Sequence, residues 1–321
     1  MKIKTKLWLI IATSLILIGC IIFTVVMFKL KWNFYKLSTI DFETNQYEID
    51  EEYSDIKIIG NTADVVFVAS NDSKSVITCF ESEKEKHIVS VKDKVLTIQL
   101  NDSRNLLDHV GVSFYSPKIT LNIPSGNYGN LSINLSTGDV SIEKDFSFNS
   151  IDIEGSTSDV KLSSSVYESI KIKLTTGDVF VDDLNVMSLD VTVSTGIVNL
   201  TNVTCYDNIN IITSTGDVYL ANVTCLNLSS TADTGSVLLK NVVASNKLYI
   251  KRDTGNVTME KCDAVEILII TSTGDVSGTI KSEKVFIANT NTGKVDVPTT
   301  ITGGRCEIQS STGDITIQIA K

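Results

Sequence analysis

Aspartates recur in this sequence at a spacing that could build a metal site. Six of them occupy the same position of a repeated segment: Asp139, Asp159, Asp178, Asp217, Asp275 and Asp314. Stacked carboxylates bind Ca²⁺ in the nonapeptide solenoids of toxins, which makes Asp139, Asp159 and Asp178 candidate ligands. The repeat here is longer, however, and the column is interrupted by Ile197, Ser236, Asn256 and Lys294. We therefore expect each carboxylate to accept hydrogen bonds from its own turn, and we expect neither a metal ion nor another cofactor.

Residues suited to catalysis are scarce. The chain has two histidines, His87 and His109, and both tryptophans lie within the first 32 residues. A Ser-His-Asp site or a His-rich metal site therefore has little material, and aromatic platforms for sugar rings are few. We expect no catalytic residue and no enzymatic activity. The alternative is a polysaccharide-processing enzyme, because an acidic chain could place two carboxylates at the separation that glycoside hydrolysis needs.

Cysteines and one charged run complete the chemical candidates. Cys205 and Cys225 lie one repeat apart, so a disulfide between them is the alternative to two buried free thiols. The run Glu81–His87 alternates acidic and basic residues and predicts a solvated turn. The formal net charge of −10 follows from 28 basic and 38 acidic residues and argues against nucleic acid as a partner.

One short motif, with the consensus STGDV, recurs ten times at intervals of 19 or 20 residues. Its centre is glycine in nine copies and Ser158 in the other, and threonine always precedes it. Apolar and polar residues alternate on both sides, which predicts two short half-buried strands joined where the glycine adopts a positive φ. The clearest predicted turns are Thr137-Gly138, Thr176-Gly177, Thr215-Gly216, Thr273-Gly274 and Thr312-Gly313.

Two all-β folds accommodate such a repeat. One is a parallel β-solenoid of about ten coils, each stacked about 4.8 Å above the last, and the other is an antiparallel β-meander. The nearly constant interval favours the solenoid, because a coil of different circumference would break register with its neighbours, whereas hairpin loops tolerate insertions. No proline occurs between Pro124 and Pro298, as expected where nearly every backbone N–H is paired.

Residues 51–130 precede the regular solenoid of residues 131–321 and contain one imperfect copy of the motif, Asn61–Phe67. Terminal repeats are usually atypical, so we predict an irregular N-terminal β cap with a few irregular coils. At the other end Asp314–Lys321 has no polar cover, which predicts end-to-end self-association. Within the cap we expect strands at Ser75–Phe80, His87–Lys92, Val95–Leu100 and Lys118–Ile123, a turn at Lys92–Lys94 and a loop at Asn101–Pro117.

Residues 7–28 are uncharged and mostly apolar, and a helix of that length spans a bilayer. We predict a single-pass signal anchor in the cell membrane, with a cytoplasmic basic leader at 1–6 and an extracellular C-terminal domain. Residues 29–50 are then a juxtamembrane stalk. In the alternative, Leu17–Cys20 acts as a lipobox and Cys20 is lipidated after cleavage.

The sequence resembles the bacterial putative-adhesin proteins, a membrane-anchored domain of unknown function built from β-strand repeats and common in the envelopes of low-GC Gram-positive bacteria. The resemblance covers residues 38–321 and is carried by the apolar start, by Ser54–Ile58 leading into TADVVFV, by Ser116–Thr120, and by the serial STGDV segments. It implies a surface-anchored β-solenoid, sometimes linked to envelope stress, and no catalytic residues. We therefore expect a non-enzymatic, adhesin-like binding or structural protein of the cell envelope, whose partner is a cell-wall polymer or a surface protein.

Overall fold

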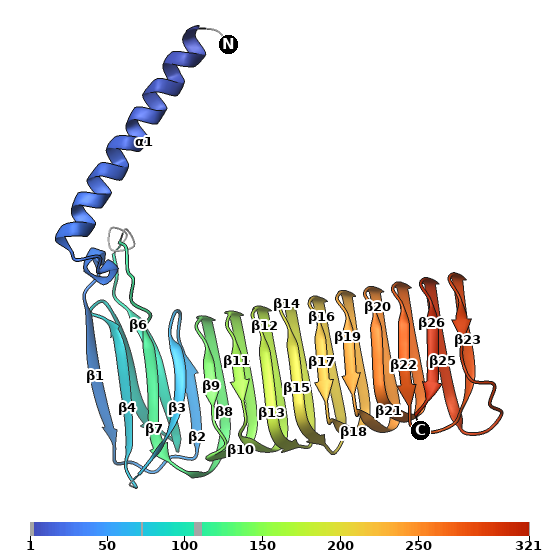
Figure 1. Ribbon diagram of the computed structural model, residues 1–321. Coiled ribbons are helices and arrows are strands. Elements are labelled where there is room, and N and C mark those ends of the chain that lie inside the picture. The colour runs from blue at the N-terminus through green and yellow to red at the C-terminus, as the bar shows by residue number, and fades with distance from the viewer. Residues whose placement is uncertain (1–2, 72, 106–110, 321) are drawn as a thin grey trace.

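The chain winds into a parallel β-solenoid whose coils stand side by side in a rod (Figure 1). The computed structural model describes residues 3–71, 73–105 and 111–320; His109 and the first two residues of the basic leader lie outside them. Equivalent strands of successive coils pair in parallel, so that Val160 lies opposite Val140 on one side and Val179 on the other. Parallel pairing confirms the predicted solenoid and excludes the antiparallel meander.

Each coil supplies one strand before the motif glycine and one after it, and the long β21 serves two coils in turn. The strands before the glycine are β8 (Gly126–Thr137), β10 (Phe146–Thr157), β12 (Ser165–Thr176), β14 (Ser188–Thr195), β16 (Asn208–Thr215), β18 (Thr224–Thr234), β20 (Val243–Thr254), β21 (Val257–Thr273), β23 (Lys284–Thr292) and β25 (Gly304–Thr312). The strands after it are β9 (Val140–Ile142), β11 (Val160–Leu162), β13 (Val179–Val186), β15 (Val198–Cys205), β17 (Val218–Ala221), β19 (Val237–Lys240), β22 (Val276–Ile280), β24 (Val295–Asp296) and β26 (Ile315–Ile319).

The motif glycines have the predicted positive φ, and stacking adds a second reason for glycine. Gly216 has φ 154°, and a Cβ there would overlap the carbonyl oxygen of Gly196 in the preceding coil. A side chain would therefore strain its own backbone and push the coils apart. Ser158 does not have a positive φ, and Gly155 leaves space for its hydroxyl group, so the exception at 158 has a compensating exception three residues earlier.

Bulges absorb the difference between 19-residue and 20-residue coils. Register shifts occur between Phe148 and Ser150, between Cys225 and Asn227, and between Ala244 and Lys247, at the corner that leads into the strand before the glycine; a fourth lies after the glycine, between Met259 and Cys262. One extra residue at this corner leaves the two long strands in register. The side chains of both strands therefore stay in columns along the rod.

Arg252 is fully buried within the stack and explains a break in the apolar pattern. Its Nη2 donates a hydrogen bond to Ser230 Oγ at 2.7 Å, and its Nη1 donates to the carbonyl of Lys251. Burial lowers the pKa of the Arg252 guanidinium to about 10, because a desolvated cation is destabilised. Ser230 is thus polar at an otherwise apolar position because it hydrogen-bonds this guanidinium.

The imperfect motif copy forms a true coil, directly against the coil of Gly138. Its strands are β2 (Asp55–Ile59) and β3 (Asp64–Ser70), which pair with β8 and β9. The prediction of irregular coils is confirmed in part: residues 95–102 and 118–124 pair in parallel with β2 and β3 on the side away from Gly138, as one more irregular coil, and the remaining cap strands extend both faces by antiparallel pairing. One face gains β6 (Val95–Asp102) and β5 (Glu85–Lys92), and the other gains β7 (Lys118–Pro124), β4 (Ser75–Ser82) and β1 (Phe42–Ile49).

The predicted strands of this cap are confirmed as β4 to β7, with positive φ at Asp93 and Lys94 in the turn between β5 and β6. The predicted loop at Asn101–Pro117 contains residues 106–110, which lie outside the described residues. The segment assigned to a stalk is largely part of the cap: β1 pairs with β4, and Tyr35 and Phe42 pack against Tyr115.

The C-terminal coils are stacked in a different order from the sequence. β25 pairs with β21 on one side and with β23 on the other, so the last coil in the chain lies between the two that precede it (Figure 1). The prediction that Asp314–Lys321 ends the stack is therefore wrong, and β23 and β24 form the outer edge. Gly303 and Gly304 let the chain pass back, because a Cβ at either would overlap a carbonyl oxygen, of Glu283 or Val265.

Helix α1 (Ile3–Lys29) extends away from the rod and joins it through a 3-10 turn, η1 (Phe34–Leu37). An 18-residue window within Lys6–Lys29 has a mean hydropathy of 2.8, and this is the one described helix that is long and apolar enough to cross a membrane. Its 27 residues extend about 40 Å. Cys20 lies exposed within this continuous helix.

Candidate functional site

The repeated turns form a straight edge along the rod, where the aspartates hydrogen-bond between coils. Asp159 Oδ1 accepts the main-chain N–H of Asp178 at 2.8 Å, one coil further along. Equivalent bonds run from the backbone of Asp139 to Asp64, Asp159 to Asp139, Ile197 to Asp178, Ser236 to Asp217, Asp275 to Asn256, Asp314 to Asp275 and Lys294 to Asp314. The expectation that each carboxylate serves its own turn is wrong: it caps the neighbouring turn.

These hydrogen bonds explain why aspartate recurs in the column and why Lys294 can interrupt it. Lys294 belongs to the outermost coil, which has no further coil to serve, so it needs no acceptor. Among the described residues, no three acidic side chains of the column come within 4.8 Å of one another. The column of Asp139, Asp159 and Asp178 therefore has a structural use for its carboxylates.

We expect Asp159→Ala to lower the free energy of unfolding by about 0.5–1.5 kcal/mol, because the N–H of Asp178 loses its acceptor at a partly buried turn. Lys294→Ala is the matched control and should change stability by less than about 0.5 kcal/mol. Hydrogen exchange at the Asp178 amide measures the local effect. Equal losses in the two variants would contradict the capping role.

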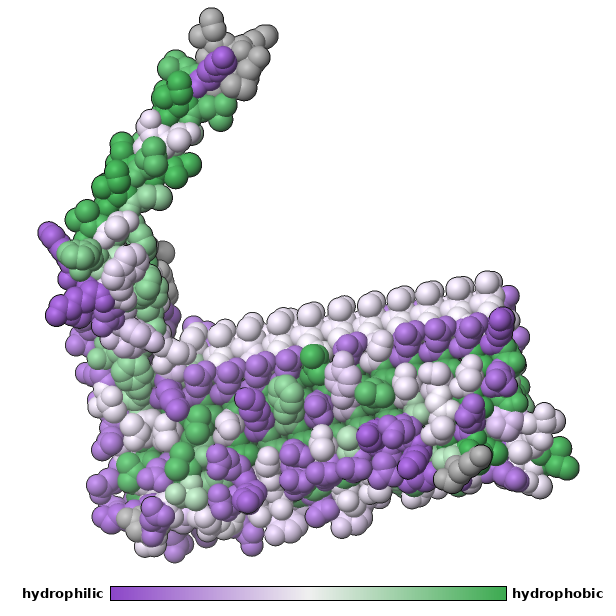
Figure 2. All heavy atoms as spheres, viewed as in Figure 1, coloured by the Kyte–Doolittle hydropathy of each residue, from purple (hydrophilic) through white to green (hydrophobic). Residues whose placement is uncertain are grey.

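Threonine and serine hydroxyl groups line the same edge and face solvent. The motif threonines lie opposite one another in register, as in Thr176 with Thr157 and Thr195. Figure 2 shows this edge as continuous pale rows with a hydrophilic row beside them, in contrast to the hydrophobic helix α1. The predicted turn residues thus form one ordered polar surface.

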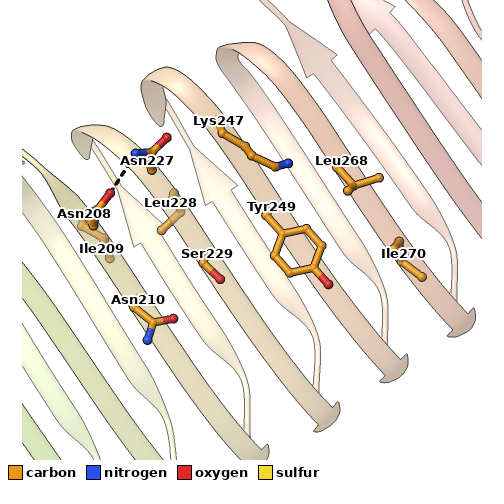
Figure 3. A pocket seen from close by; sticks show the side chains of 10 residues that line it. All are labelled: Asn208, Ile209, Asn210, Asn227, Leu228, Ser229, Lys247, Tyr249, Leu268 and Ile270. Carbon is orange, nitrogen blue, oxygen red and sulfur yellow. Dashed lines mark hydrogen bonds between the residues drawn. The ribbon is translucent and has the colours of Figure 1, made fainter.

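A shallow groove of about 570 Å³ lies on the face formed by β16, β18, β20 and β21 (Figure 3). Outward-facing residues of successive coils line it in two columns. One column runs through Asn208, Asn227 and Lys247, and the other through Asn210, Ser229, Tyr249 and Leu268. Asn227 Nδ2 donates to Asn208 Oδ1 at 2.8 Å, which fixes the orientation of both amides.

The groove combines neutral hydrogen-bonding groups with apolar surface. Tyr249 lies half-buried among the lining residues, next to Leu268 and Ile270, and no acidic residue lines the groove. Lys247 Nζ lies 3.4 Å from Oε2 of Glu266, a residue beside the groove, so the charge of Lys247 is partly balanced. Amides, a phenol and apolar side chains in one concave surface suit a polyhydroxylated ligand with an apolar ring face.

This groove was not predicted from the sequence, because only tryptophans and pairs of acidic residues were considered as signs of a sugar-binding or catalytic site. Tyr249 stands six residues before its motif glycine, a position that alternation places on the outer surface. Asparagines at corresponding positions of successive repeats were the other signal. Aligning the outward positions coil by coil would have located the groove.

The cysteines of the rod are buried free thiols, so the predicted alternative, a Cys205–Cys225 disulfide, is absent from the described residues. Burial raises the pKa of Cys225 to about 12, because a thiolate is poorly solvated there. The run Glu81–His87 contains the predicted solvated turn, at Glu83 and Lys84, but the turn does not extend over the whole run. Both end residues of the run are buried, since the Glu81 carboxylate hydrogen-bonds His87 inside the cap.

A coiled rod with a polar repeat edge and an apolar N-terminal helix defines the class as a β-solenoid with one candidate membrane span. The chain belongs to the Toastrack DUF4097 family, whose model matches residues 53–209 and 204–321. This confirms the resemblance seen in the motifs. No curated protein is matched by the sequence.

Solved structures share the fold at low sequence identity. A putative adhesin from Parabacteroides distasonis is 16% identical with a TM-score of 0.52, over 75% of this chain and 98% of its own. One from Parabacteroides merdae is 16% identical with a TM-score of 0.51, over 74% and 97%. A protein from P. distasonis described as a putative lipid binding protein is 16% identical with a TM-score of 0.50, over 74% and 96%.

Proposed function

We propose that this protein is a membrane-tethered, non-enzymatic binding protein of the cell envelope, whose groove binds a cell-wall polysaccharide. The observation that carries the proposal is the arrangement of Tyr249 with the asparagines of neighbouring coils. A sugar ring can stack on the phenol while its hydroxyl groups exchange hydrogen bonds with the amides. Because the lining residues come from four successive coils, an extended polymer can lie along the rod and contact several coils at once.

Tethering is supported by α1. Trp8 and Phe28 are more than 70% exposed on this helix, and an apolar helix without a protein partner is stable in a bilayer. Trp32 and Tyr35 follow it, as aromatic residues do at membrane interfaces. The basic leader then lies in the cytoplasm and the rod outside, and the family resemblance supports a link to envelope stress.

The neighbouring structures described as putative adhesins agree with a binding role. Binding without turnover is also consistent with the groove, because its lining lacks a carboxylate pair. If soluble fragments were released from peptidoglycan or teichoic acid by the full chain in detergent micelles, the protein would be an enzyme and the proposal would be wrong.

Tyr249→Ala should weaken binding of the full chain to peptidoglycan glycan strands about tenfold, since loss of one stacking aromatic removes about 1.4 kcal/mol. Tyr206→Ala is the matched control, because Tyr206 is 64% exposed and does not line the groove. Co-sedimentation with insoluble glycan measures both. Equal glycan binding by the two variants and the unchanged chain would show that the polymer does not bind in the groove.

A further inference from the structure

Three residue types that bind metal ions meet inside the N-terminal cap, away from the groove and the aspartate edge. Cys79 and Glu81 are alternate inward-facing residues of β4, and His87 lies on β5, joined to β4 by a hairpin. Their exposed fractions are 0%, 1% and 3%. One donor atom from each lies within 4.8 Å of the other two, and this is the one such group of three among the described residues.

Hydrogen bonds orient the carboxylate and the imidazole. Glu81 Oε2 accepts from His87 Nδ1 at 2.6 Å and from the main-chain N–H of His87 at 2.7 Å. Asn45 Nδ2 donates to Glu81 Oε1 at 2.7 Å. These bonds hold the carboxylate and the imidazole side by side, with donor atoms close enough to share one ion.

The cluster also leaves bonding capacity unused. His87 Nε2 is buried without a hydrogen-bond partner, although an unmade buried hydrogen bond costs about 1–3 kcal/mol. Cys79 is a free thiol. His87 Nδ1 and Glu81 Oε2 are already adjacent, so both can serve as ligands once the proton they share is displaced. A structural ion pair alone accounts for Glu81 and Nδ1 but gives no role to Nε2 or to the neighbouring sulfur.

We propose that Cys79, Glu81 and His87 bind a thiophilic divalent cation of the Zn²⁺ class. Sulfur, nitrogen and one carboxylate oxygen are the ligand set of Zn²⁺, whereas Ca²⁺ and Mg²⁺ take oxygen alone. Tetrahedral zinc holds its ligand atoms roughly 3.4–3.6 Å apart, so the observed group needs to shift by about 1 Å. On binding, the thiol proton is released to water, the proton between His87 Nδ1 and Glu81 Oε2 moves through water to Nε2, and sulfur, nitrogen and oxygen each form a bond to the metal; nothing is oxidised or reduced.

A cavity adjoins the cluster at one of the three proposed ligands. It has a volume of about 180 Å³ and reaches His87 between the cap and the coil of β2 and β3, and Asn61, Ser82 and Tyr115 also line it. The three proposed ligands leave the fourth tetrahedral position to water. The site would link β4 to β5, the two strands that connect the opposite faces of the cap.

Co²⁺ is the probe, because a cobalt–thiolate bond has an intense near-ultraviolet absorption. The full chain in detergent micelles is reduced, freed of metal with a chelator and titrated with Co²⁺. We expect one equivalent to produce this absorption and Zn²⁺ to abolish it. Cys79→Ser should remove the absorption, and His87→Gln should weaken Co²⁺ binding at least about tenfold. Cys306→Ser, which removes another buried thiol, should leave both unchanged.

Absence of a cobalt–thiolate absorption in the unchanged chain would overturn the proposal without reference to any variant. So would an absorption that survives in Cys79→Ser, since the bound thiolate would then be elsewhere. Far-ultraviolet circular dichroism checks that each variant keeps its β structure. The result is independent of glycan binding, which depends on the groove.

Discussion

Gly216→Ala should lower the free energy of unfolding by more than about 3 kcal/mol. An alanine at φ 154° is strained by about 1–3 kcal/mol, and its Cβ would overlap the carbonyl oxygen of Gly196 in a backbone that the two neighbouring coils hold in place. Relief requires the coils to separate at this edge, which breaks interstrand hydrogen bonds. Chemical denaturation of the full chain in micelles, read by circular dichroism, measures the loss.

Gly126→Ala separates the effect of backbone strain from the effect of overlap between coils. Gly126 has φ 158°, but a Cβ there would meet no atom within 4 Å. This control should therefore show backbone strain without the overlap, and a loss at least about 2 kcal/mol smaller. Equal losses in the two variants would show that contact between coils does not determine the need for glycine.

Ile308→Ala should cost about 2–4 kcal/mol, as expected for a large-to-small change at a fully buried position. Ile308 lies in the last coil of the sequence but between two coils of the stack, opposite Ile269 and Ala288. The cavity would weaken contacts on both sides. Hydrogen exchange should therefore accelerate in β23 as well as in β25.

Ile269→Ala is the matched comparison, because Ile269 occupies the same column and is also fully buried. The two variants should agree within about 0.5 kcal/mol. If the coils stacked in sequence order, Ile308 would belong to the uncovered end coil and its replacement would cost much less. Such a result, with β23 unaffected, would contradict the observed order.

The predicted end-to-end self-association now concerns β23 and β24, and light scattering of the full chain at increasing concentration tests it.

The repeat made much of this fold predictable. Position-by-position alternation identified the strands, and the constant interval identified coils, because circumference is a local property of each segment. The glycine at each turn was predictable for the same reason, because the positive φ it provides is also a local property of the repeat. The extra residue of the longer coils could not be located, since a bulge depends on which residues lie opposite each other.

The candidate sites were less accessible to sequence reasoning. Tyr249 and Asn227 are 22 residues apart and become neighbours only through stacking. Glu81 and His87 lie in a charged run whose composition indicates exposure, yet the cap closes over them. Burial of a charged residue depends on whether hydrogen-bond partners such as Asn45 lie close enough to offset desolvation, and local composition does not encode that.

By itself the sequence determined the period, the turn chemistry, the apolar columns and the apolar N-terminal helix, all of which depend on residues within one coil or one helix. Only the tertiary structure decided the order of the coils at the two ends. Every coil presents the same ladder of N–H and C=O groups at the same spacing, so any coil can pair with any other. Which coils become neighbours depends on the segments that connect them, such as the close passage at Gly303 and Gly304, and on the packing of the cap.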